Sequence, residues 1–116
     1  MSDRAHILLS YHEVGIAESG TTSDAIDTNE ETVVGLEVPA SLTSTSISFT
    51  CCESSTGTFV PLRDTTNTPL TITCDTSAGQ FFFDPSNFAG VRFLKVVMGS
   101  SEAAARTLKL ITRKLA

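Results

Sequence analysis

Alternating apolar and polar residues run through most of the chain and predict an all-β protein. The alternation is strictest in residues 46–53 (SISFTCCE) and 70–74 (LTITC), and residues two apart on a strand share one face. Further strands are expected at residues 32–38, 58–63, 80–84, 91–98 and 107–114, with a short one at 23–27. Because turn residues separate these runs, we expect a single antiparallel β-sandwich of the jelly-roll type.

One face of each strand is expected to form the core. Its predicted members are Val34, Leu36, Phe49, Cys51, Leu70, Ile72, Phe81, Phe83, Leu94, Val96, Leu108 and Leu110. The three cysteines, at positions 51, 52 and 74, match no zinc spacing and suggest no disulfide framework. Cys51 and Cys74 fit instead as small core hydrophobes.

The strands at residues 80–84 and 91–98 are apolar on both faces. Such a strand either lies in the middle of a sandwich or has its outer face covered by a second chain, and both interpretations stay open. The candidate protein-interface residues are Ile7, Leu9, Tyr11, Phe82, Phe93, Lys95 and Val97.

The N-terminal segment is apolar and is followed by a polar, acidic stretch at residues 18–31. We therefore divide the chain into an N-terminal strand or arm, residues 1–17, and a β-sandwich domain, residues 18–116. An arm would dock by strand addition on a neighbouring protein. A first strand would pair within its own domain.

Composition and charge narrow the function classes. The 116 residues carry a net charge of −5, with 12 acids against two bases in residues 1–90 and six bases against one acid in residues 91–116. An acidic surface argues against nucleic acid as a partner. The chain has no transmembrane-length apolar run or signal peptide, so no membrane partner is expected and synthesis is expected in the cytoplasm. The oppositely charged regions favour self-association as a dimer or trimer.

The sequence contains no arrangement typical of an active site. No Gly-x-Ser-x-Gly elbow or phosphate-binding loop occurs, and His6 and His12 have no second ligand at metal spacing. Glu30 and Glu31 lack the spacing of a calcium loop. We expect no catalytic residue, no metal and no cofactor. The absence of Trp and the single Tyr also disfavour a carbohydrate-binding module.

From about residue 15 onward, short motifs occur in an order that resembles a known family. They are Ile16-Ala17-Glu18-Ser19-Gly20, Ser23-Asp24-Ala25, Val34-Gly35-Leu36, Ile47-Ser48-Phe49, Thr58-Phe59, Asp84-Pro85, Phe88-Ala89-Gly90, Arg92-Phe93-Leu94-Lys95 and Ala105-Arg106-Thr107-Leu108. In this order the chain resembles small virion proteins encoded in the head gene clusters of tailed bacteriophages. It departs from the family at residues 95–100, where apolar Val97 and Met98 replace a polar edge.

The resemblance implies a non-enzymatic structural protein of the virion. The function we expect from it is a capsid cement, or decoration, protein that binds the major capsid protein on the surface of the phage head. The alternative is a structural or adhesin module of the neck, tail or baseplate. A carbohydrate-binding module is the third hypothesis.

Overall fold

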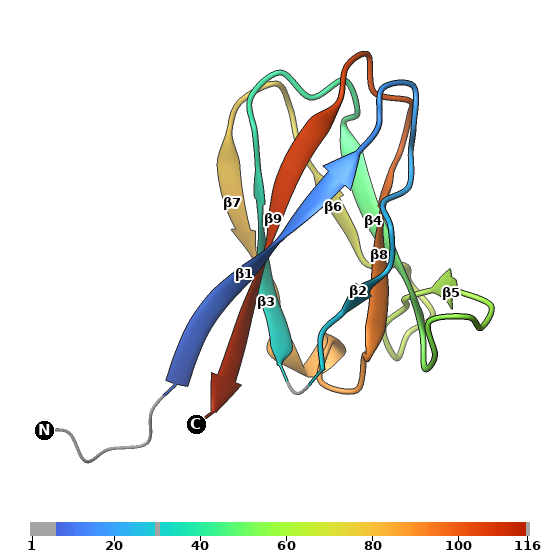
Figure 1. Cartoon of the computed structure of the whole chain (residues 1–116), viewed down its shortest axis with the longest axis vertical. Helices are drawn as coiled ribbons and strands as arrows, with labels where there is room; N and C mark the ends of the chain where they lie inside the picture. The colour runs from blue at the N-terminus through green and yellow to red at the C-terminus, as the bar shows by residue number, and fades with distance from the viewer. Residues whose placement is uncertain (1–6, 30, 116) are drawn as a thin grey trace, which may run out of the picture.

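The computed structural model describes residues 7–29 and 31–115, apart from the side chains of residues 7–9 and 115. Two antiparallel sheets pack as a β-sandwich (Figure 1), which confirms the predicted all-β class. The four-stranded sheet has the order β1-β9-β3-β7, with bounds Ile7–Ile16, Arg106–Leu115, Thr32–Val38 and Gly79–Phe82. The five-stranded sheet has the order β2-β8-β4-β5, with bounds Ile26–Asp27, Phe93–Met98, Ser46–Cys52 and Val60–Pro61; β6, Thr71–Thr73, also pairs with β4.

The strand pairs are nested along the chain. β1 pairs with β9, β2 with β8, β3 with β7 and β4 with β6, all antiparallel. The first and last described strands, β1 and β9, therefore lie side by side in one sheet, as Figure 1 shows. This nesting is consistent with a jelly roll, and that narrower class stays a prediction.

The core lies between the two sheets and contains most of the residues that the alternation predicts. Leu36, Leu94, Val96, Leu108 and Leu110 are completely buried, and Phe49 is nearly so. Cys51, Leu70, Phe81 and Phe83 are only partly buried and pack against this core from its rim.

The prediction that Val34 belongs to the core is wrong. The pairing of β3 with β9 shifts register between Val33 and Gly35, so that the alternation breaks at this point. Val33 becomes buried at 1% exposure, whereas Val34 is only half-buried. A bulge of this kind inserts one residue and moves every earlier side chain to the other face.

An aromatic cluster closes one side of the sandwich. Phe88 follows the 3₁₀ turn Pro85–Asn87, which begins at Asp84 because the Asp84 carboxylate accepts a hydrogen bond from the Ser86 N–H. The Phe88 ring stacks on Phe83, with 5.0 Å between centroids, and meets Phe49 edge-on at 5.5 Å. The predicted connector thus contributes a core residue, since Phe88 is only 1% exposed.

The N-terminal segment is a strand of the domain from Ile7 onward. It pairs with β9 over ten residues, from Ile7 opposite Leu115 to Ile16 opposite Arg106. Val14 and Ile16 reach the core, with 2% and 1% exposure. Of the two alternatives for this segment, the described residues show the intrachain strand; residues 1–6 lie outside the described part. No helix in that part is long and apolar enough to cross a membrane.

Candidate protein-interaction face

The outer face of the four-stranded sheet carries a row of apolar residues that crosses all four strands. Tyr11 of β1 lies opposite Ile111 of β9, which lies opposite Gly35 of β3, which lies opposite Phe82 of β7. Tyr11 is 55% exposed and Phe82 is 67% exposed. We call this set the apolar row. Two exposed aromatic rings on one sheet face are typical of a protein-binding surface.

Gly35 allows the Phe82 ring to lie over the middle of the sheet. A Cβ atom at this position would come within 2.9 Å of the ring and 2.8 Å of the Phe81 carbonyl oxygen. No other residue therefore fits here without displacing Phe82. The ring covers the neighbouring strand instead of standing at the sheet edge.

A charged row runs beside the apolar row, two residues further along each strand. It consists of Glu13, Lys109, Glu37 and Gln80, in the same strand order. The Glu37 carboxylate accepts a 2.6 Å hydrogen bond from the Gln80 amide, and lies 3.9 Å from the Lys109 ammonium. The Lys109 ammonium also lies 4.8 Å from the centre of the Tyr11 ring. The two rows are thus held together by a cation–π contact.

A shallow hollow of about 280 Å³ opens between the two rows. Tyr11, Lys109 and Ile111 form one part of its lining, and Glu37 and Gln80 form another. Its walls are apolar side chains and its rim is charged. Protein interfaces also combine an apolar centre with a polar rim, so the hollow has the character of a binding site for a side chain of another protein.

The outer face of the five-stranded sheet carries the other predicted interface residues. Phe93, Lys95 and Val97 alternate along β8 and are half-buried. The Arg92 guanidinium lies 5.0 Å from the centre of the Phe93 ring, and the Lys95 ammonium lies 4.4 Å from that of Phe59. The chain itself therefore covers part of the outer side of β8.

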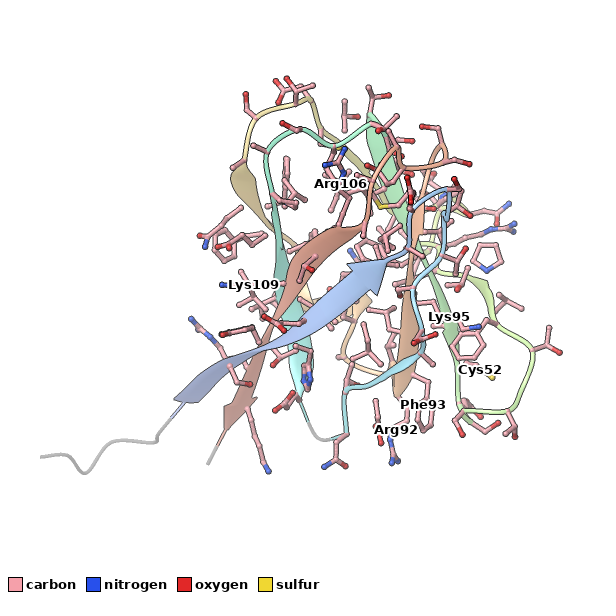
Figure 2. The ribbon with its side chains drawn as sticks, turned by 45° about the horizontal axis from the view of Figure 1, so that its top comes forward. Cys52, Arg92, Phe93, Lys95, Arg106 and Lys109 are labelled. Carbon is pink, nitrogen blue, oxygen red and sulfur yellow. The ribbon has the colours of Figure 1, made fainter. Side chains whose placement is uncertain are left out.

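The predicted interface residues do not form one patch. Figure 2 shows Lys109, which marks the four-stranded sheet, on one side of the sandwich and Phe93 and Lys95 on the other. Tyr11 and Phe82 belong to the first side. Ile7 and Leu9 belong to β1, and their side chains lie outside the described part. Sequence reasoning missed Ile111, Glu37 and Lys109, which only the register of the sheet places beside Tyr11 and Phe82.

The five-stranded sheet also has an exposed apolar end. Val60 of the short strand β5 is 52% exposed, and it lines a hollow of about 410 Å³ together with Cys52, Thr58, Val91 and Arg92.

Burial raises the pKa of the Cys51 and Cys74 thiols above their ordinary value, so these two cysteines are poor nucleophiles.

His12 is part of a hydrogen-bonded cluster that the sequence did not predict. Its Nε2 lies 2.7 Å from the Glu31 carboxylate, which also accepts hydrogen bonds from the hydroxyls of Ser10 and Thr112. These contacts, with that of His12 first, hold the pKa of Glu31 below its ordinary value. Nucleophilic catalysis needs the histidine to contact the hydroxyl, and here it contacts the carboxylate. The cluster is an arrangement for fastening β1 to the segment before β3.

Within the part of the chain that the structure describes, no three His, Cys, Asp or Glu side chains are grouped as a metal site would require. His6 and Glu30 lie outside that part.

No protein-family model matches the chain, and the curated proteins contain no significant match to it. Among solved structures, the chain is similar to a chain of the cyanophage Pam1 capsid asymmetric unit. The TM-score is 0.45 and the identity 16%, over 96% of this chain and 85% of that chain. A similarity of this size assigns neither a family nor a function.

Proposed function

We propose that this protein is a non-enzymatic structural protein of a tailed-phage virion, a cement protein that binds the major capsid protein lattice and stabilises the head. The order of short motifs along the sequence supports the virion class. The observation that carries the binding role is that both sheets of the sandwich present exposed apolar side chains. Tyr11 and Phe82 lie on the outer face of the four-stranded sheet, and Val60 lies on the edge strand β5 of the five-stranded sheet, opposite Cys51.

A cement protein needs more than one contact, because it must join neighbouring subunits of a shell. A sandwich that binds through two separate surfaces can do so without a conformational change. If it binds only the expanded lattice, each copy stabilises that state by mass action. Many weak contacts then add up over the lattice through avidity.

We assign the capsid contact to the exposed end of the five-stranded sheet, around Val60 and its hollow. This end presents an apolar side chain beside the acidic Glu53 and the basic Arg92. An apolar centre with a charged rim is what a specific protein contact requires.

The test is decoration of shells of the encoding phage that lack this protein. Purified protein is mixed with expanded shells and with unexpanded shells, and the bound fraction is measured by co-sedimentation. We expect saturable binding to expanded shells only. Val60→Asp should abolish binding while leaving the fold intact, because Val60 is exposed. Ala104→Asp, at an exposed loop position away from both faces, is the matched control. Binding by Val60→Asp at the wild-type level would reject the assigned surface, and no binding of wild type to either shell would reject the cement role.

A further inference from the structure

The outer face of the four-stranded sheet has a pattern that is complementary to itself. Consider a two-fold axis that lies above the face, parallel to the strands and midway between β9 and β3. Because the strand order is β1-β9-β3-β7, this rotation places β9 over β3 of a second copy and β1 over β7. The rotation does not shift residues along the strand direction. Each row of register partners across the sheet therefore lies over the same row of the second copy, in reverse order.

This rotation brings opposite charges together. Lys109 of one copy lies over Glu37 of the other, twice by symmetry, because these residues are register partners on β9 and β3. Glu13, which is the partner of Lys109 on β1, lies over the uncharged Gln80 on β7. No like charges meet in the charged row, and such complementarity fixes the register of an interface.

The apolar row is matched by the same rotation. Tyr11 of one copy lies over Phe82 of the other, and Ile111 lies over Gly35, which the Phe82 ring covers. The hollow beside Ile111, of about 280 Å³, provides space for an aromatic ring of the second copy. Aromatic pairs across a sheet interface add about 0.5–1.5 kcal/mol beyond the burial of their area.

The other in-plane two-fold axis does not fit. An axis along the apolar row would keep each strand over itself and exchange the two ends of the strand. Lys109 of β9 would then lie over Arg113 of β9, which is the residue two positions beyond Ile111 on the other side. Two like charges would meet at each of two symmetric places, at a cost to binding. Of these two axes, the charges therefore favour the one that is parallel to the strands.

We propose that two copies of the chain pair face to face through this surface, with Lys109 of each copy bound to Glu37 of the other. The occupant is a second copy because the acid and the base that the face presents are complementary to each other. The face measures roughly 19 by 20 Å, from strand spacing and rise, or about 400 Å² per copy. Interfaces below about 1,200 Å² in total are weak, so we expect a dissociation constant in the micromolar range. The pairing is independent of the proposed virion role.

Charge reversal tests the pairing. Lys109→Glu and Glu37→Lys each place like charges across the interface, so each variant alone should dimerise at least tenfold more weakly than wild type. In an equimolar mixture, the glutamate introduced in one variant meets the lysine introduced in the other, and the unchanged Glu37 meets the unchanged Lys109. Association should therefore return to within a few-fold of wild type. Sedimentation velocity over a concentration series up to about 1 mM measures all four samples, since weak interfaces need this range.

The mixture separates this pairing from an intrachain effect. Lys109 and Glu37 also lie 3.9 Å apart within one chain, and both variants lose that contact, which mixing cannot restore. Phe82→Ser should weaken dimerisation, whereas Lys95→Glu on the opposite face should not. A wild-type protein that stays monomeric would overturn the proposal. So would a dimer whose two folded charge variants do not associate with each other on mixing. Either result leaves capsid decoration through Val60 untouched.

Discussion

The Glu102 carboxylate is 1% exposed and holds three loops together. It accepts hydrogen bonds of 2.8 Å from the backbone N–H groups of Thr43 and Ser44, and one of 3.0 Å from Arg106 Nε. Its own backbone carbonyl accepts from the Ser19 N–H. Figure 2 shows Arg106 at the loop end of the sandwich. The sequence contains no signal for this role, because a single Glu in a polar loop looks like a solvated residue.

Glu102→Gln should make the protein less stable at neutral pH. The free energy of unfolding of the variant should also fall less than that of wild type as the pH is lowered. Burial raises the pKa of Glu102, but the hydrogen bonds from Thr43, Ser44 and Arg106 outweigh it and lower the pKa from 4.5 to about 2. The stabilisation is therefore complete above pH 4.5 and is lost as the pH falls towards 2. At 1.36 kcal/mol per unit, it amounts to roughly 3 kcal/mol.

Urea unfolding of wild type and Glu102→Gln at pH 7 and pH 3 measures this contribution. The difference in unfolding free energy between the two proteins should be about 3 kcal/mol at pH 7 and roughly half of that at pH 3. Other carboxylates titrate in both proteins, so the difference isolates Glu102. An equal difference at the two pH values would show that the carboxylate contributes by packing alone.

Alanine substitutions of three phenylalanines that are close in sequence should lower the free energy of unfolding by different amounts. Phe88→Ala should cost about 3–5 kcal/mol, the range for a fully buried phenylalanine, because Phe88 is 1% exposed. Phe83→Ala should cost less, since Phe83 packs at the rim of the core. Phe82→Ala, at 67% exposure, should change stability by about 0.5 kcal/mol or less. Thermal melts of the three variants measure this order. A decrease in melting temperature for Phe82→Ala as large as that for Phe88→Ala would contradict it.

At the scale of the strands, period-two alternation predicted most of the sheet. Residues 32–38 are the strand β3 as expected, and β4, β8 and β9 differ from the predicted bounds by one or two residues. The predicted strands at 58–63 and 70–74 shorten to Val60–Pro61 and Thr71–Thr73. These strands lie at a sheet edge, where pairing on one side only ends them early. The bulge at Val33–Gly35 leaves no sequence signal, because both valines suit a strand.

Deleting residues 1–16 should prevent folding. The deletion removes β1, exposes the side of β9 that pairs with it, and takes Val14 and Ile16 from the core. A deletion of residues 1–6 keeps the whole of β1 and is the matched control. Circular dichroism and solubility of the two proteins decide between the alternatives for this segment. A folded, soluble protein without residues 1–16 would show that β1 is a detachable arm.

At the scale of the whole molecule, the sequence indicated apolar outer faces but not their arrangement. Alternation places Phe82 and Phe93 outward, and the structure adds that they lie on opposite sheets. Glu37 and Lys109 are far apart in the sequence and become neighbours only through the register of β3 with β9. Cross-strand partners of this kind depend on the topology, which a single sequence does not determine. Their local patterns are those of ordinary exposed strand residues.

The copy number of this protein in purified virions tests the cement proposal most directly. Quantitative mass spectrometry gives its ratio to the major capsid protein in the same particles. A cement protein occupies equivalent positions over the whole shell, so we predict a fixed ratio of the same order as the number of capsid subunits. A ratio that corresponds to a single vertex or to the tail would contradict the proposal and favour a neck, tail or baseplate component.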